Sequence, residues 1–305
     1  MNLFKLSWKY LTFRPLSTGL NVFLLALGLA IITVLLLIQD QFEKKMNQDA
    51  AGIDLVVGAK GSPLQLILAG VYHIDFPTGN IPMDEAQKLS RNRLVKNIIP
   101  MALGDNYPGF RIVGTNHDYL ALYEAKLESG ALWVKPFEVV LGAEVAVKSG
   151  YKVGDEFLGS HGISVGSHEH DANKFKVVGV LDRQVNVLDR LILTSVESIW
   201  YTHDEGEADP TDSIANQEEI NMINLQDSVA VKGFPKTTQS RDLTTLLIQY
   251  RNPMAAIQLP RLINSGTSMQ AASPSFEMSR LFELLGVGIT LLQGLAVVII
   301  GISEQ

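Results

Sequence analysis

The feature that most constrains this chain is an uncharged apolar run from Leu20 to Ile38. Among its nineteen residues, Asn21 and Thr33 alone have polar side chains. As a helix rising about 1.5 Å per residue, the run is roughly 28 Å long, about the thickness of a bilayer's hydrocarbon core. A helix also satisfies its own backbone hydrogen bonds where water is absent. The run is therefore predicted to span a membrane.

A second apolar run, Leu284–Ile302, lies near the other end of the chain. The first run is preceded by Lys5, Lys9 and Arg14, and no acidic residue occurs before Asp40. Basic residues flank membrane helices on the cytoplasmic side. We therefore expect a cytoplasmic N-terminus and an extracytoplasmic location for the long segment between the two runs.

The predicted organisation has five parts. They are a cytoplasmic amphipathic elbow helix at 1–16, a first transmembrane helix at 17–39, an extracytoplasmic domain at 40–280, a second transmembrane helix at 281–303 and the start of a cytoplasmic segment at 304–305. Pro15 ends the amphipathic pattern of the elbow. The alternating charges from Asp40 to Lys45 indicate that the first helix continues beyond the membrane surface.

Short strand and helix patterns interleave irregularly between the two runs, which predicts a mixed α+β domain. Strands are expected at 53–57, 98–103, 110–114, 138–141, 155–158, 175–181, 191–194, 227–231 and 244–250. Helices are expected at 83–90, 143–149, 196–201 and 253–264, and from 275 into the second run. The glycine-rich passage from Gly58 to Ile81 is predicted to be irregular, and Gly142 and Gly154 suit tight turns at strand ends.

The composition excludes several classes of function. The chain has no cysteine, so disulfide scaffolds, zinc-thiolate sites and thiol catalysis are excluded. The net charge of -7 comes largely from an acidic insert, His203–Glu219, which contains no Lys or Arg. Nucleic-acid binding therefore has no electrostatic basis in this sequence. The insert lacks the residue order of a calcium-binding loop and is interpreted as a surface loop.

Three histidines, His161, His168 and His170, form a group with Glu169 and Asp171, and the run His168-Glu169-His170-Asp171 alternates imidazole and carboxylate. Imidazole and carboxylate groups in alternation are able to bind zinc or another divalent ion. The segment is rich in Gly and Ser and lies between two predicted strands. We interpret it as a solvated hairpin loop and keep metal binding by the three histidines as the alternative.

Two further motifs have the letters of a catalytic site without its context. Gly162–Gly166 reads G-x-S-x-G, but no apolar strand precedes Ser164 and no helix follows, as a nucleophile elbow requires. Gly58–Ser62 has the residue types of a phosphate loop in the wrong order. We predict no catalytic and no cofactor-binding residue in this chain.

Several stretches resemble FtsX-like ABC transporter permeases with a MacB-like core domain. They are Arg14-Pro15 before the first span, 139–146 followed by 149–155 with its V-G-D turn, and the strand at 175–181. The stretches 54–63 and 72–80 resemble one branch of such permeases, whereas the loop 182–186 departs from the family pattern. Family members have four spans, so two further spans are expected after Gln305.

The resemblance implies a permease in the bacterial inner membrane that is not itself an enzyme. A separate cytoplasmic ABC ATPase would bind ATP-Mg, and a second permease protomer, identical or different, would complete the transporter. A periplasmic partner protein is also expected. As in MacB and LolC or LolE type permeases, the cargo would be a lipoprotein, a peptide or an envelope component.

A different class of protein has the same layout. In a two-span receptor, an extracytoplasmic domain binds a ligand and a signalling module follows the second span. The sequence up to Ile302 fits both classes. In a receptor, the histidine and acidic loops would be the candidate ligand sites.

Overall fold

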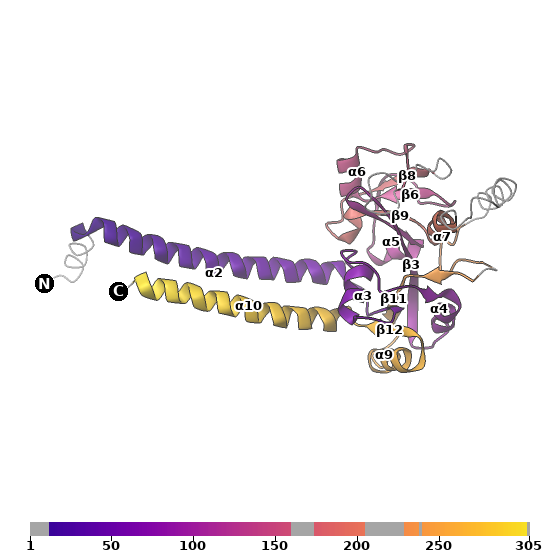
Figure 1. Ribbon diagram of the computed structural model, residues 1–305. Coiled ribbons are helices and arrows are strands. Elements are labelled where there is room, and N and C mark those ends of the chain that lie inside the picture. Colours follow the sequence, from indigo (N-terminus) through magenta and orange to yellow (C-terminus); the bar gives the residue numbers. More distant parts are fainter. Residues whose placement is uncertain (1–11, 160–173, 205–228, 238–239, 304–305) are drawn as a thin grey trace, which may run out of the picture. The chain divides into compact units, whose positions relative to one another are not determined.

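The computed structural model describes residues 12–159, 174–204, 229–237 and 240–303 (Figure 1). The chain forms two compact units. The first, here called the helical unit, comprises Met1–Asn47 and Met278–Gln305. The second, here called the body, comprises Gln48–Glu277.

Two long helices form the described part of the helical unit. Helix α2 (Pro15–Asp49) has 35 residues, and helix α10 (Pro274–Ser303) has 30. Proline is accepted in the first turn of a helix because its missing N–H would have no partner there, and α2 begins at Pro15. Helix α2 continues past Ile38 through the alternating charges, where Lys44 pairs with Asp40 at 2.8 Å. The predicted continuation of the first helix is confirmed.

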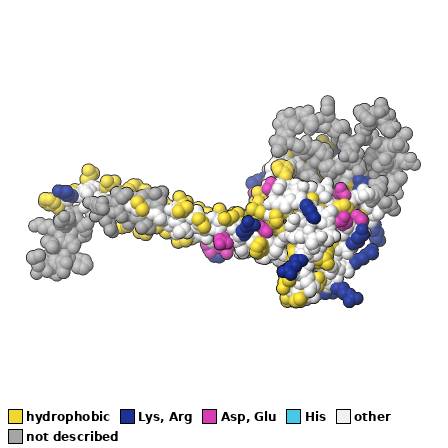
Figure 2. All heavy atoms as spheres, turned by 60° about the horizontal axis from the view of Figure 1, so that its bottom comes forward, with side chains coloured by type: hydrophobic (Ala, Val, Ile, Leu, Met, Phe, Trp, Pro, Cys, Tyr) yellow, Lys and Arg dark blue, Asp and Glu magenta, His cyan; other side chains and the backbone are white. Residues whose placement is uncertain are grey.

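Helices α2 and α10 lie side by side within the helical unit (Figure 1). The rings of Phe42 and Phe282 meet edge to face, with centroids 5.9 Å apart. Figure 2 shows mainly hydrophobic side chains along the described parts of these helices. Within the described residues, α2 is the helix that is long and apolar enough to cross a membrane, and its most apolar window is 6% buried. An apolar helix that is not covered by protein fits a lipid environment.

The body is built on a mixed β-sheet, which in the described residues has ten strands in the order β12-β1-β11-β3-β4-β9-β6-β8-β5, with β7 also paired to β8. The pairs β4–β9 and β6–β8 are parallel and the other pairs are antiparallel. The strands are β1 (Leu55–Ala59), β3 (Val95–Tyr107), β4 (Phe110–Thr115), β5 (Leu127–Gly130), β6 (Glu138–Leu141), β7 (Glu156–Phe157), β8 (Phe175–Leu181), β9 (Leu191–Ser195), β11 (Thr245–Tyr250) and β12 (Met269–Ala272). A second, two-stranded sheet pairs β2 (Ile81–Pro82) with β10 (Asp242–Leu243).

Short helices connect the strands of the body. They are α3 (Pro63–Gly70), α4 (Met83–Ser90), α5 (His117–Leu122), α6 (Ala143–Ser149), the 3-10 helix η1 (Val187–Arg190), α7 (Val196–Asp204) and α9 (Ala255–Gly266). The predicted mixed α+β fold of the body is confirmed. The core contains the fully buried side chains of Trp133, Tyr119 and Phe175.

Three of these helices, α3, α5 and η1, were not predicted. The passage predicted to be irregular after Gly58 contains α3, whose N-terminus is capped by Ser62: its hydroxyl accepts a hydrogen bond from the N–H of Gln65. Pro63 occupies the first turn of the same helix. Helix α5 is capped in a similar way by Asn116. Local capping of the free N–H groups thus stabilises short helices that lack a long apolar pattern.

The strand predicted at 227–231 is wrong in its described part, 229–231, which is irregular. Its backbone groups bond to helix ends instead of a neighbouring strand. The N–H of Ala230 donates to the Glu197 carboxylate at 2.8 Å, and the carbonyl of Val231 accepts from the N–H of His117 at 3.0 Å. These bonds replace the ladder that a strand would need.

Candidate functional site

The two long helices connect to neighbouring strands of the sheet. Helix α2 is followed by β1, and α10 is preceded by β12. Strands β1 and β12 are paired antiparallel, with Val56 opposite Ala272 and Ala59 opposite Met269. Each long helix is therefore connected in sequence to one of two hydrogen-bonded strands at the same end of the sheet.

A buried cluster lies in the body where α2 ends. We call Asp49, Tyr72, His73, Tyr119 and Tyr123 the junction cluster. The Tyr123 hydroxyl donates to the backbone carbonyl of Asp49. The rings of Tyr123 and Tyr119 meet edge to face at 5.4 Å, and the Tyr119 hydroxyl lies 3.2 Å from Nε2 of His73. The cluster thus ties the last residue of α2 to two separate segments of the body.

Burial sets the protonation of the junction cluster. Burial raises the pKa values of Tyr72 and Tyr119, and the charge of Asp49 raises both further. Burial lowers the pKa of His73 to about 3, and the nearby charges of Arg111 and Arg190 lower it further. The cluster therefore holds neutral tyrosines and a neutral histidine at pH 7.

His73 is an unusual residue in two further respects. Its Nδ1 atom is buried without a hydrogen-bond partner in the described residues. Its backbone φ is +54°, a left-handed conformation that few residues other than glycine adopt. A buried polar atom without a partner and a strained backbone both cost free energy, and such features are concentrated at functional positions.

The loop after His73 exposes two large apolar side chains. Ile74 is 63% exposed and Phe76 is 60% exposed. Arg111 stabilises this loop through two contacts. Its guanidinium donates a hydrogen bond to the carbonyl of Asp75 at 2.7 Å and lies 5.6 Å from the centre of the Phe76 ring. The junction cluster is thus continuous along the chain with an ordered, exposed apolar loop.

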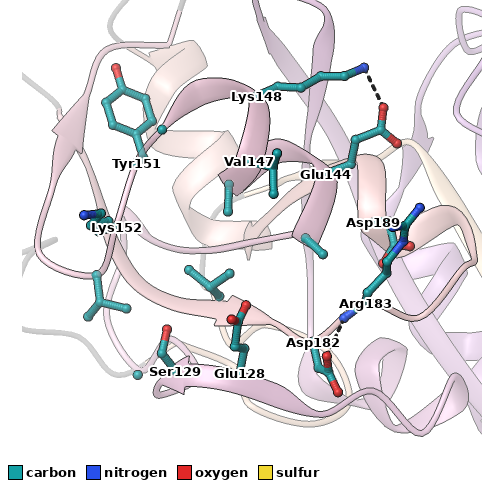
Figure 3. Close-up of a pocket in the computed structure, with 16 residues that line it drawn as sticks. Glu128, Ser129, Glu144, Val147, Lys148, Tyr151, Lys152, Asp182, Arg183 and Asp189 are labelled. Carbon is teal, nitrogen blue, oxygen red and sulfur yellow. Dashed lines mark hydrogen bonds and ion pairs between the residues drawn. The ribbon is translucent and has the colours of Figure 1, made fainter.

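A groove of about 910 Å³ lies between α6 and β5, and we call it the α6–β5 groove (Figure 3). Helix α6, strand β5, the turn after α6, strand β8 and the chain around η1 all contribute to it. Its lining residues are Glu128, Ser129, Gly130, Ala143, Glu144, Ala146, Val147, Lys148, Gly150, Tyr151, Lys152, Val153, Val180, Asp182, Arg183 and Asp189. The groove combines aliphatic side chains with charged groups of both signs.

The predicted site residues are not part of the junction cluster or the groove. His161, His168 and His170, Ser164 and nearly all of the acidic insert lie outside the described residues. Metal binding by the three histidines therefore stays a prediction. In the part of the chain that is described, no group of three or more His, Asp and Glu side chains is placed to hold a metal ion. The Gly58–Ser62 motif leads into the cap of α3.

Comparison with known proteins identifies the family. No curated protein matches the chain. The periplasmic region of MacB from Actinobacillus actinomycetemcomitans has 13% identity and a TM-score of 0.45, over 78% of this chain and 97% of that one. The extracellular domain of the noncanonical ABC-type transporter YknZ from Gram-positive bacteria has 12% identity and a TM-score of 0.40, over 72% and 99%. A domain of a permease protein from Porphyromonas gingivalis has 11% identity and a TM-score of 0.32, over 73% and 89%.

The decisive match is to a family described as the MacB-like periplasmic core domain. It covers residues 18–233, more than two thirds of the 305 residues. The range begins in α2 and includes the junction cluster and the α6–β5 groove. The resemblance predicted from the sequence is confirmed, and the chain belongs to the family of ABC transporter permeases that carry a MacB-like periplasmic core domain.

Proposed function

We propose that this chain is the membrane-embedded permease subunit of an ABC transporter, with its body outside the cytoplasm. The match to the MacB-like periplasmic core domain is the observation that supports this function best. The chain has no G-x-x-x-x-G-K-[ST] sequence, so ATP-Mg would bind to a separate cytoplasmic ATPase. A second protomer would complete the transporter, and the cargo would be a lipoprotein, a peptide or an envelope component.

In this proposal, α2 transmits motion from the membrane to the body. A helix of 35 residues is roughly 52 Å long, so about 20 Å remains outside a bilayer core. The helix shows no break between Pro15 and Asp49, and a continuous helix moves as one element. The Tyr123 hydroxyl binds the carbonyl of its last residue, Asp49, and five residues separate Asp49 from β1. Displacement of α2 would therefore reposition β1 and the junction cluster together.

The membrane topology is part of the same proposal. Helix α10 would be the second span, and the N-terminus would be cytoplasmic because of Lys5, Lys9 and Arg14. Since the chain lacks cysteine, a single introduced thiol is the one labelling site. In intact cells with a permeabilised outer membrane, Val147→Cys, at a position 82% exposed, is expected to react with a membrane-impermeant maleimide. Labelling that appears only after cell lysis would contradict an extracytoplasmic body.

The ATPase partner gives the most direct test of the function. The full-length protein, expressed at its native level and isolated in detergent, is expected to co-purify with an ABC ATPase subunit in stoichiometric amount. Reconstitution of the pair in nanodiscs should raise the ATPase rate above that of the ATPase subunit alone. Recovery of a histidine kinase or a chemotaxis protein in its place would favour a two-span receptor.

The connection between α2 and the body makes a separate prediction. Tyr123→Phe removes the hydroxyl that binds the Asp49 carbonyl and keeps the ring contact with Tyr119. We expect a loss of about 1 kcal/mol in local stability, hence roughly fivefold faster amide hydrogen exchange over residues 48–53. Tyr250→Phe is the matched control, because the described residues show no hydrogen bond from its hydroxyl. Equal exchange in the two variants would mean that Tyr123 does not hold the end of α2.

A further inference from the structure

Strand β5 is the last strand of the sheet, and its outer edge faces no other strand in the described residues. All four residues of β5 are exposed, whereas its inner edge pairs with β8. The open edge of a strand presents unpaired backbone N–H and C=O groups, which bind an additional extended segment readily. The chemical groups at this edge are therefore suited to pair with a polypeptide in β conformation.

The α6–β5 groove is lined by Glu128, Ser129 and Gly130 of this edge strand. Val147 on α6 is 82% exposed and Val153 is 44% exposed, and both line the groove together with Val180 of β8. Figure 3 shows the labelled side chains of α6 on one side of the cavity and Glu128 and Ser129 of β5 on the other. Its volume of about 910 Å³ lies within the range of binding pockets. Side chains on one face of a strand added to β5 would enter this space.

The charges of the groove match a chain that carries both signs. Lys148 pairs with Glu144 at 2.6 Å, so these two charges largely satisfy each other and contribute little to the choice of ligand. Lys152 lies at one side of the cavity, and Glu128 of β5 lies apart from it (Figure 3). No ion pair involves either side chain in the described residues. A purely anionic ligand would meet the carboxylates, whereas a segment with one acidic and one basic residue complements both positions.

The far end of the groove is held in a fixed shape. The carboxylate of Asp189 accepts hydrogen bonds from the N–H groups of Gln184 and Val185, both at 2.8 Å. Val185 has a φ of +58°, which is rare and costly for a β-branched residue. This loop places Asp182 and Arg183 at the groove before any ligand arrives. Preformed geometry lowers the entropic cost of binding.

We propose that the α6–β5 groove binds an extended segment of a partner protein, which pairs with β5 as an added strand. Its apolar side chains contact Val147 and Val153, an acidic residue faces Lys152 and a basic residue faces Glu128. Because β5 has four residues and a bulge between Leu127 and Ser129, pairing contributes few hydrogen bonds and the groove supplies most of the affinity. The extracytoplasmic location of the partner rests on the proposed function. The binding of an extended segment to the groove does not depend on that function.

A random twelve-residue peptide library, displayed on phage, tests this proposal with the full-length chain in lipid nanodiscs. Selected peptides are synthesised and their affinity is measured by fluorescence anisotropy. Val147→Glu is expected to weaken binding about tenfold or more, because it places an unpaired charge in the groove. Ile257→Glu is the matched control: Ile257 is 55% exposed on α9, which packs against β12 at the other end of the sheet, and affinity should be unchanged.

A second variant and a modified peptide test the recognition mode. Lys152→Glu should weaken the binding of peptides that contain an acidic residue. Methylation of alternate backbone nitrogens in the peptide removes the hydrogen bonds to β5 and should weaken binding severalfold. Full affinity for the methylated peptides, equal affinity for Val147→Glu, or a failure to select any peptide would each overturn the proposal. The peptide assay contains no ATPase and no nucleotide, so a negative result leaves the proposed permease function intact. Likewise, failure to recover an ABC ATPase would leave the proposed peptide binding intact.

Discussion

Replacing Gly142 with alanine is expected to lower the free energy of unfolding of the body by about 3 kcal/mol. A Cβ atom at this position would lie 2.1 Å from the carbonyl oxygen of Leu188 and 2.6 Å from the carbonyl carbon of Asp189. Both are backbone atoms of η1, which cannot rotate away as a side chain would. Leu188 is fully buried, and the Asp189 carboxylate binds two backbone N–H groups. The clash therefore has to be relieved by separating α6 from η1.

Gly150→Ala is the matched control for this prediction. Gly150 ends α6 with a φ of +76°, and no atom lies within 4 Å of the position of an added Cβ. The control therefore costs backbone strain of about 1 kcal/mol without a clash. Urea unfolding of the full-length protein in detergent, followed by tryptophan fluorescence, to which the buried Trp133 and Trp200 contribute, measures both changes. If the two variants lose equal stability, the close approach of α6 to η1 is not the reason that position 142 is glycine.

The sequence predicted that Gly142 serves a tight turn, and the structure gives a different reason. Its φ is -66°, which any residue adopts, so the requirement is space beside η1 and not backbone freedom. Gly154, predicted on the same grounds, has a φ of +103° and does need the conformational freedom of glycine. Local sequence shows that a strand ends, but the atom that approaches Gly142 comes from a segment more than forty residues later.

Elements with strong local signals were predicted with their observed bounds. Helix α4 starts with two acidic residues in its first turn, α6 lies between two glycines, and β6 and β8 are short runs rich in β-branched residues. The elements that were missed lack such signals. Helix α3 is short and largely apolar, with Gln65 as its one polar side chain, and β5 has no alternation because all four of its residues are exposed. The Ser62-Pro63 cap was the one local indication of α3.

The junction cluster and the groove were beyond prediction from one sequence. Asp49 and Tyr123 are separated by 74 residues, and His73 and Tyr119 by 46. No local pattern pairs residues at such distances, and an isolated Tyr or His in an apolar stretch looks like an ordinary core residue. The groove depends on the strand order of the sheet, because β5 pairs with β8 although β6 and β7 lie between them in the sequence. Motifs drew attention to His168 and Ser164, whereas His73, which has no motif, is the histidine among those in the described ranges whose pKa is strongly lowered.

His73 is expected to make the stability of the body depend on pH below about 6.5. Its pKa falls from an ordinary value of 6.5 to about 3 in the folded protein, first because of burial and then because of Arg111 and Arg190. Between these values the unfolded chain binds a proton that the folded chain does not, so acid favours unfolding. The contribution is about 1.4 kcal/mol for each pH unit below 6.5, and it is absent above that pH.

The effect of His73 is isolated by comparison with His73→Asn, because carboxylates and other histidines titrate in both proteins. Asparagine tolerates a φ near +54° better than most residues and does not titrate in this range. We expect the free energy of unfolding, measured in urea at pH 6, 5 and 4, to fall more steeply in the parent by about 1.4 kcal/mol per unit. Identical slopes would mean that His73 takes up a proton in the folded state.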